Sequence, residues 1–219
     1  MRVIEEIKAY ARAVVKGEVA CSRTECPCCG GTPGEFHPHE RRSRLFLVIV
    51  GTLVQLVRGR LVRWKCDLCG KTFTDYPPFA VPRKRYVAQS LVGRARQYVE
   101  ADALTYRRAV LQERMPISYE GEAGETQGRQ LSPTTLWRWV GLAGGLKETL
   151  REALALVKAK APACVIFRFV PAIAPWKYQS TRRRRVLERA ARVFEAARIC
   201  RGLFGVEIFP DFGTRVGWR

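Results

Sequence analysis

Two short cysteine motifs decide the fold predicted for this chain: Cys26-Pro27-Cys28-Cys29-Gly30 and Cys66-Asp67-Leu68-Cys69-Gly70. Each motif places two thiols three residues apart and ends in glycine, which tolerates the left-handed backbone of a tight turn. Two such turns supply the four sulfur ligands that a structural Zn²⁺ ion prefers in tetrahedral geometry. We therefore predict a zinc site formed by the outer cysteines of both motifs: Cys26, Cys29, Cys66 and Cys69.

The ligand set leaves alternatives open. Cys28 adjoins Cys29, and Cys21, His37 and His39 lie nearby in the sequence, so one of them could replace a named ligand. Cys26 and Cys29 are preferred because their spacing and following glycine match the second motif. The two histidines are expected in a solvated loop. Four thiolates leave no open coordination position, so the expected ion is structural rather than catalytic.

The 36 residues between the two motifs, 30 to 65, must loop out and return. Residues 45–50 and 53–58 have the composition of strands, separated by Gly51-Thr52. Gly59 is expected to turn the chain, and residues 61–65 to lead it back to Cys66. This segment is therefore predicted to form a β ribbon whose two ends are held together by zinc.

The charge of the chain predicts its class of partner. It has 219 residues and 39 Lys+Arg against 20 Asp+Glu, which gives a net charge of +19. Nucleic acid is the polyanion that best fits such a surplus, ahead of an anionic membrane surface. The longest apolar run, 45–57, is too short to cross a bilayer, so no membrane association is expected. The first residues do not resemble a signal peptide, and the motif spacing favours thiolate ligands over disulfides, which indicates a reducing cytoplasm.

Helical periodicity dominates the rest of the chain. Helices are expected at 3–16, 86–100, 105–112, 132–140, 146–160 and 182–200, the last capped by Thr181, with a strand at 164–170 and a flexible acidic loop at 119–130. The predicted fold class is α+β, mainly α, with a small zinc-ribbon β module followed by a helix-turn-helix-like helical domain. The expected domains are an N-terminal helix (1–19), the zinc ribbon (20–75), a Pro-rich connector (76–85), the helical domain (86–160) and a basic C-terminal region (161–219).

Three basic regions and one helix start are candidate contacts with nucleic acid. Ser132-Pro133 opens a helix with a favoured cap and first residue, and its exposed N-terminal positions suit the recognition helix of a helix-turn-helix. The candidate side chains on this helix are Thr134, Thr135 and Arg138. The other candidates are Arg58, Arg60 and Arg63 on the ribbon, Arg83, Lys84 and Arg85 on the connector, and Arg182, Arg183, Arg184 and Arg185 at a helix start.

Catalysis by this chain is not indicated. It contains four Asp (Asp67, Asp75, Asp102 and Asp211), of which the first two fall in the ribbon and connector and Asp102 in the helical middle. A two-metal nuclease or transposase site needs several carboxylates brought together. Near the C-terminus only Asp211, Glu207, Glu195 and Glu188 remain for that purpose.

The order of motifs carries a family resemblance. A C-P-x-C-G knuckle, a β ribbon, the run C-x-x-C-G-K-T-F-T, then P-P-F-x-x-P-x-K-R-Y and L-S-P-T-T-L-W-R-W-V together resemble the N-terminal DNA-binding part of bacterial insertion-sequence transposases and related small standalone proteins. The resemblance covers about residues 20–145. It implies that the four cysteines bind zinc and that Thr134, Thr135 and Arg138 face DNA. The acidic-triad catalytic domain of the full transposases is missing.

The leading expectation is a zinc-stabilised DNA-binding protein of mobile-element origin, a non-catalytic transposition accessory or regulator associated with the bacterial nucleoid. Its partners would be double-stranded DNA and a transposase or other protein subunit. One alternative is a truncated or diverged transposase subunit whose catalytic carboxylates come from a partner chain. Another is an RNA-binding zinc-ribbon protein.

Overall fold

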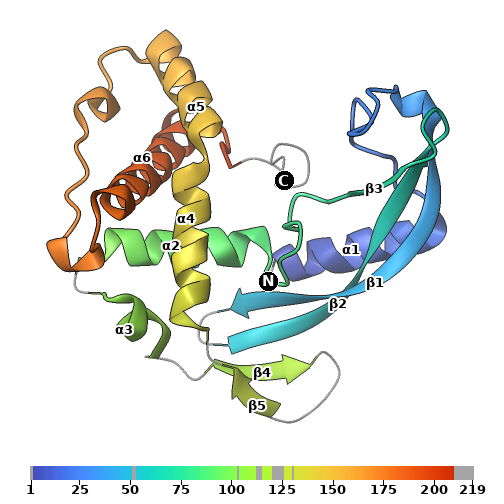
Figure 1. Cartoon of the computed structure of the whole chain (residues 1–219), viewed down its shortest axis with the longest axis horizontal. Coiled ribbons are helices and arrows are strands. Elements are labelled where there is room, and N and C mark those ends of the chain that lie inside the picture. The colour runs from blue at the N-terminus through green and yellow to red at the C-terminus, as the bar shows by residue number, and fades with distance from the viewer. Residues whose placement is uncertain are drawn as a thin grey trace. The chain divides into compact units, whose positions relative to one another are not determined.

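The computed structural model of the chain describes residues 2–50, 53–102, 104–111, 115–119, 126–129 and 131–209. The chain divides into two compact units, which are described separately. Unit 1 comprises residues 1–90, 115–129 and 210–219, and unit 2 comprises 91–114 and 130–209. The class is mixed α+β with more helix than strand, as predicted (Figure 1).

Unit 1 is organised around a long antiparallel hairpin of β1 (Phe36–Val50) and β2 (Leu53–Cys66) (Figure 1). The pairing runs from Phe36 opposite Cys66 to Val50 opposite Leu53, with a bulge between Pro38 and Glu40. Three short strands extend this sheet beyond β2. β3 (Thr72–Asp75) pairs antiparallel with the second half of β2, β4 (Met115–Tyr119) pairs parallel with its first half, and β5 (Thr126–Arg129) pairs antiparallel with β4.

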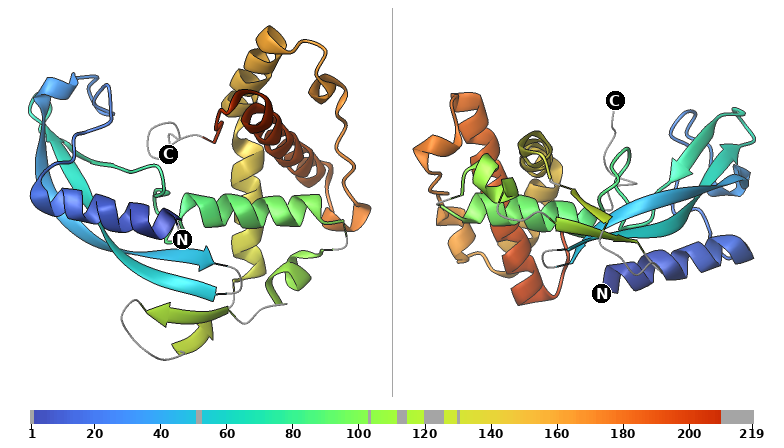
Figure 2. Two further views of the ribbon diagram at one scale, coloured as in Figure 1. Left: turned by 180° about the vertical axis from the view of Figure 1, so that it is seen from behind. Right: turned by 90° about the horizontal axis from the view of Figure 1, so that it is seen from below.

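The helix α1 (Arg2–Lys16) runs along this hairpin (Figure 2). Its apolar stripe, predicted from the 3.6-residue period, is buried at Val3, Ile4, Ile7 and Val14. The first three of these pack with Phe46, Val57 and Leu61 of the hairpin. Val14 belongs to a second cluster with Val62, Trp64 and Phe73 close to the cysteine motifs. The helix therefore links the middle of the hairpin to the end that carries the cysteine motifs.

The predicted turn at Gly59 is wrong. Gly59 lies inside β2, opposite Arg44, and it is buried. A Cβ at this position would come within 2.7 Å of the Phe46 ring and 2.9 Å of the Ile7 side chain. The glycine is therefore required because a helix and an aromatic ring close over the strand, and local sequence alone does not distinguish that role from a turn.

The buried side chains of β2 do not all lie on one face of the strand. Buried positions fall at Val57, Gly59 and Leu61 and then continue at Val62, Trp64 and Cys66, so the alternation shifts by one residue. Arg58 and Arg60 are exposed before the shift. The Pro-rich stretch expected to act as a connector contributes Phe79 and Ala80 to the buried core of unit 1.

Unit 2 is helical. Its helices are most of α2 (Ala88–Glu100), α3 (Tyr106–Leu111), α4 (Pro133–Gly145), α5 (Lys147–Lys160) and α6 (Thr181–Phe204), with short 3₁₀ turns at Val165–Arg168 and Pro175–Lys177. The Ser132 cap and Pro133 start of α4 are confirmed, since the Ser132 hydroxyl accepts from the Thr135 N–H at 3.1 Å. Leu136, Trp139 and Val140 are buried while Trp137 is 49% exposed, so the two tryptophans face opposite ways.

Helices α4 and α6 cross at Gly144. A Cβ on Gly144 would lie 2.4 Å from the Val186 carbonyl oxygen and 2.8 Å from its side chain. Contact this close requires that one helix present no side chain at the crossing point. The absence of a side chain at Gly144 thus sets how closely the two helices pack.

A buried lysine holds the C-terminal end of α2. Lys177 is 4% exposed, and its ammonium donates to the carbonyls of Tyr98 at 3.0 Å, Val99 at 3.3 Å and Ala101 at 2.7 Å. The last carbonyls of a helix have no partner within the helix, and a cation placed there also complements the helix dipole. Burial lowers the pKa of Lys177, and the nearby Asp102 carboxylate opposes that shift.

Three other local predictions need correction. The segment expected as a strand at 164–170 forms a 3₁₀ turn, and the cap of α6 is Ser180 rather than Thr181. The expected acidic loop begins with Tyr119 at the end of β4, and its residues 126–129 form β5; residues 120–125 and 130 lie outside the described part of the chain. Among the described residues, no helix is both long and apolar enough to cross a bilayer.

Candidate metal centre

The two cysteine motifs fold into matching turns. The N–H of Cys26 donates to the Gly31 carbonyl at 2.8 Å, and the N–H of Cys66 donates to the Lys71 carbonyl at 3.0 Å. Gly30 and Gly70 each donate back to the carbonyl of the first cysteine, at 3.0 and 2.8 Å, and both adopt positive φ, 75° and 67°. The glycine that follows each motif therefore closes the turn in the left-handed conformation predicted for it.

These turns bring the sulfur atoms of Cys26, Cys29, Cys66 and Cys69 within 4.8 Å of one another. The Sγ atoms of Cys26 and Cys69 are 3.8 Å apart, as are those of Cys29 and Cys66. A tetrahedral zinc ion with Zn–S bonds of about 2.3 Å has S···S edges of about 3.8 Å, whereas a disulfide has an S–S length of about 2.05 Å. All four residues are free thiols in a geometry that fits one zinc ion.

The thiols influence one another's ionisation. Burial opposes ionisation of Cys26, but the N–H groups of Cys28 and Cys29, together with the neighbouring thiols, outweigh it and lower the pKa of Cys26 to about 6. The Gly31 N–H favours ionisation of Cys29, yet its contacts with Cys69, Cys26 and Cys66 and its burial raise the pKa to about 12. A second negative charge is thus unfavourable in the cluster unless a cation is bound, which is the electrostatic condition of a metal site.

The alternative ligands lie outside the cluster. Cys28 is exposed, and Cys21 is half-buried among apolar side chains, where burial raises its pKa to about 11. His37 and His39, expected in a loop, lie in β1, and His37 Nδ1 contacts the Asp67 carboxylate at 3.0 Å. His37 thus links β1 to the second turn. Within the described ranges, the four predicted cysteines form the one group of His, Cys, Asp or Glu side chains close enough to share a metal ion.

The chain around the cluster is fixed by a buried carboxylate. Asp75, at the end of β3, is 5% exposed and accepts hydrogen bonds from the Ser22 N–H at 2.6 Å and the Ser22 hydroxyl at 2.9 Å. The Asp67 N–H donates to the Glu35 carbonyl at 2.9 Å, which ties the second turn to the start of β1. The metal centre therefore sits at the open end of the hairpin, where β1 begins and β2 ends.

The predicted arginines of the hairpin differ in availability. Arg58 and Arg60 are exposed, but Arg63 is half-buried and lies 3.8 Å from Glu40. Arg41 and Arg42, which are not among the predicted contacts, are also exposed on β1, across from this part of β2. The signal for them was present in the run Arg41-Arg42-Ser43-Arg44.

The basic run after β3 forms a tight turn. The Lys84 N–H donates to the Val81 carbonyl at 3.1 Å, with Pro82 in the second position and Arg83 in the third. Arg83 has φ 59°, which is the left-handed region that glycine normally supplies at this position. Arg83 and Arg85 are exposed and Lys84 is half-buried.

At the start of α4, the exposed predicted side chains are Thr134 and Arg138, one helical turn apart. Thr135 is half-buried, and its hydroxyl lies 2.8 Å from that of Ser132, so it belongs to the cap of the helix. The structure therefore leaves two of the three candidates on this helix facing solvent.

The four arginines at the start of α6 separate into different environments. Arg183 is half-buried, hydrogen-bonds to the Tyr106 hydroxyl, and places its guanidinium 4.6 Å from the centre of the Trp137 ring. Arg184 pairs with Glu188 at 2.8 Å. Arg182 and Arg185 are exposed. Arg183 therefore packs within unit 2, whereas Arg182 and Arg185 face solvent.

The carboxylates considered for a transposase-like site are paired with arginines. Glu188 pairs with Arg184, Glu195 with Arg198 at 2.6 Å, and Glu207 with Arg201 at 2.5 Å. Asp211 lies outside the described residues. These three glutamates therefore each form a surface ion pair.

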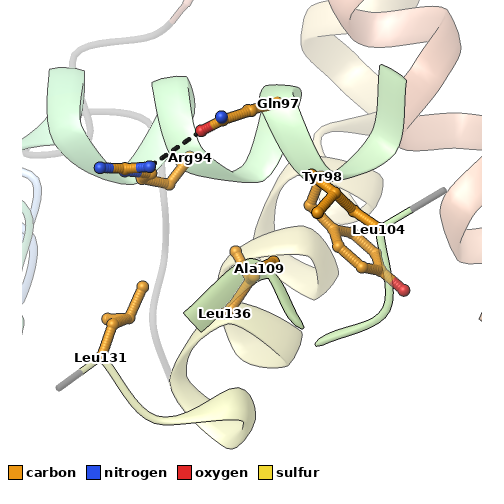
Figure 3. A pocket seen from close by; sticks show the side chains of 7 residues that line it. All are labelled: Arg94, Gln97, Tyr98, Leu104, Ala109, Leu131 and Leu136. Carbon is orange, nitrogen blue, oxygen red and sulfur yellow. Dashed lines mark hydrogen bonds between the residues drawn. The ribbon is translucent and has the colours of Figure 1, made fainter. Parts of the chain in front are cut away.

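A small cavity lies within unit 2 between α2 and α4 (Figure 3). Its volume is about 40 Å³, and its lining includes Tyr98, Leu104 and Leu136, with Arg94 bonded to Gln97 at 3.0 Å along α2. Sites for small-molecule ligands are typically about 300–1,000 Å³. This cavity is of a size for ordered water and not for a substrate.

No protein family, curated protein or solved structure matches this chain.

Proposed function

We propose that this chain is a zinc-stabilised protein that binds double-stranded DNA without catalysing a reaction. The observation that carries the proposal is the charge of the hairpin next to the four-cysteine cluster. Between Phe36 and Cys66 there are seven Arg or Lys residues and one acidic residue, Glu40. An arginine-rich element of this kind suits phosphate and guanine contacts.

The pairing of the strands places exposed arginines on one face. Arg60 lies opposite Ser43 and Arg58 lies opposite Leu45. Cross-strand partners project to the same face of a sheet, and every second residue along a strand does so too. Arg58 and Arg60 therefore share a face with Arg41, and all three are exposed.

A two-stranded ribbon is an established shape for DNA recognition. The major groove of B-DNA is about 12 Å wide and admits either a helix or a two-stranded β ribbon. β1 from Pro38 to Leu45 is exposed apart from the half-buried Arg44. This part of the hairpin offers a surface free to enter a groove, and guanidinium groups on it would meet phosphate oxygens or base edges.

The proposed role of zinc is to hold the base of this hairpin. The first residue of β1, Phe36, pairs with the last residue of β2, Cys66, which is itself one of the four ligands. A bound ion would join Cys66 to Cys26 and Cys29 ahead of β1, and so fix the position of the strand start. The zinc thus acts on recognition indirectly, by keeping the hairpin in one conformation.

A second contact is proposed at the start of α4. Thr134 and Arg138 are exposed there, and the helix N-terminus itself favours phosphate. The order of these elements resembles that of bacterial insertion-sequence transposases, from which we infer a mobile-element origin. On that basis we propose a role as transposition accessory or regulator, with a transposase as protein partner.

The test is a titration of fluorescently labelled duplex DNA at several salt concentrations. The expected result is binding that weakens steeply with salt, by a slope of about −0.9 for each phosphate neutralised. The double variant Arg58→Gln/Arg60→Gln should weaken binding and flatten the salt slope by about 2. The matched control is Arg138→Gln/Arg151→Gln, which removes the same charge from unit 2 and one proposed contact only, so the slope should change by about 1.

Two results would overturn the proposal. One is the absence of duplex binding by the wild-type protein loaded with zinc. The other is binding that does not respond to salt, because phosphate contacts would then contribute nothing.

Single-stranded RNA is a second candidate because large aromatic side chains are exposed in unit 2. Trp176 is 61% exposed and Phe167 is 41% exposed. Exposed rings of this kind stack on unpaired bases. Competition between duplex DNA and single-stranded RNA in the same titration decides between the two candidates. If Trp176→Ala weakens the binding of RNA and leaves the binding of duplex DNA unchanged, RNA is the favoured partner.

A further inference from the structure

A groove of about 380 Å³ lies within unit 2, between α6 and the segment that joins the two 3₁₀ turns. One wall is formed by Val170 and Pro171. The other wall is formed by Arg185, Glu188, Arg189 and Arg192 of α6. These four residues are spaced i, i+3, i+4 and i+7, which places them on one face of the helix.

The side chains that line this groove carry a net positive charge. Three of its side chains are guanidinium groups, and the single carboxylate, Glu188, pairs with Arg184 at 2.8 Å. The charge of Glu188 is thus already compensated by an arginine outside the lining. Arg192 donates to the Phe169 carbonyl at 3.4 Å, a contact that orients it along the edge of the groove.

Arg189 carries the main evidence for a ligand. Its Nε atom is buried and has no hydrogen-bond partner in the described structure. Buried polar atoms are nearly always paired, and Nε is one of the donors through which arginine holds an oxyanion with two parallel bonds. The half-buried Arg189 side chain lines the groove with two further guanidinium groups, and its unpaired Nε leaves it a donor to offer to a bound anion.

We propose that this groove binds a phosphate group, held by Arg189 and flanked by Arg185 and Arg192. Planar guanidinium groups match phosphate geometry better than any other side chain does. Val170 and Pro171 give the site an apolar wall against which a sugar could pack. That the phosphate belongs to a nucleic-acid backbone rests on the proposed function, and the groove would then be a contact that the hairpin and α4 do not supply.

The experiment compares wild-type protein with Arg189→Gln, Arg189→Lys and the control Arg151→Gln, an exposed arginine on α5 outside the groove. Calorimetry with inorganic pyrophosphate tests the phosphate site itself, and duplex titrations across a salt series test its use with DNA. Thermal melts confirm that each variant is folded. Should Arg189→Gln fail to fold, Arg189→Lys keeps the positive charge but lacks the paired donors and answers the same question.

The expected result is that Arg189→Gln weakens pyrophosphate binding about tenfold or more, because two charge-assisted bonds are lost. It should also reduce the duplex salt slope by about 1. Arg189→Lys should weaken pyrophosphate binding while retaining most of the slope. Arg151→Gln should leave pyrophosphate binding unchanged.

Pyrophosphate binding by Arg189→Gln equal to that of the wild type would overturn the groove as a phosphate site, whatever the duplex results. If the wild-type protein binds pyrophosphate through Arg189 but binds no duplex, the proposed function fails while the phosphate site stands, and its ligand is a small phosphorylated molecule. Duplex binding that is unaffected in every Arg189 variant would leave the proposed function intact and overturn the groove as its contact.

Discussion

Replacing Lys177 by methionine removes the ammonium that holds the end of α2 and keeps most of the side-chain volume. Three carbonyl oxygens, of Tyr98, Val99 and Ala101, lose a partner at 2.7–3.3 Å. Because Lys177 is 4% exposed, water does not replace the ammonium without rearrangement of the surrounding packing.

The magnitude follows from opposing contributions. A hydrogen bond to a charged group contributes about 1.5–3 kcal/mol, and a buried group left unpaired costs about 1–3 kcal/mol. The cost of desolvating the ammonium, which methionine does not incur, offsets part of this. We expect Lys177→Met to lower the free energy of unfolding of unit 2 by about 2–4 kcal/mol, and its melting temperature by roughly 10–20 °C.

The assay is hydrogen exchange of the α2 amides, together with thermal melts followed by circular dichroism. Lys158→Met is the matched control, since Lys158 is exposed on α5. The variant should speed exchange at the C-terminal end of α2 first. A Lys177→Met protein that melts with the wild type and protects the α2 amides equally would refute the view that this ammonium stabilises the helix end.

Three further predictions concern stability and metal content. Gly144→Ala should destabilise unit 2 by about 1–3 kcal/mol or more, because the added methyl overlaps the neighbouring helix backbone; Gly145→Ala, which meets nothing within 4 Å, should be neutral or stabilising in the same denaturant titration. Purified wild-type protein should contain one zinc per chain by elemental analysis, Cys69→Ser should lose it, and Cys28→Ser should retain it; equal zinc loss in both variants would contradict the ligand assignment. Burial lowers the pKa of Lys177 below its ordinary value of 10.5, so the unfolded chain holds that proton more tightly, and stability should rise with pH in the interval just below 10.5. Denaturation measured across this interval should show a smaller rise for Lys177→Met, and an identical rise would remove Lys177 as its source.

The two cysteine turns were predictable because the geometry of each turn is local. Two residues between paired cysteines and a glycine after each pair specify the turns, and both turns form as predicted. The start of α4 was predictable for the same reason, since the Ser132 hydroxyl accepts a hydrogen bond from the N–H of Thr135, only three residues later. Sequence spacing is sufficient wherever the interacting atoms lie within one turn of the chain.

The features that sequence analysis missed depend on contacts between distant segments. The sequence around Gly59 predicts a turn, because the reason for the glycine lies in Ile7, more than 50 residues away, and in the Phe46 ring. The role of Lys177 is not readable from its local sequence, because the carbonyls that it binds belong to the end of α2 and to Ala101 just beyond it, 76–79 residues earlier. Arg183 was grouped with its neighbours, although Tyr106 and Trp137 draw it into the packing of unit 2.

The exposed arginines of β1 also bear on how the protein stays in solution. Among the described residues, β1 pairs with β2 along its length and with Tyr86 through Leu47, which leaves the backbone of residues 36–46 as a sheet edge. An open edge of this length is a template for strand addition by another copy, which proteins prevent with charges and bulges. β1 has both features: the charges of Arg41 and Arg42, and the bulge at Pro38–Glu40. A variant in which these arginines are replaced would therefore also be more prone to aggregate.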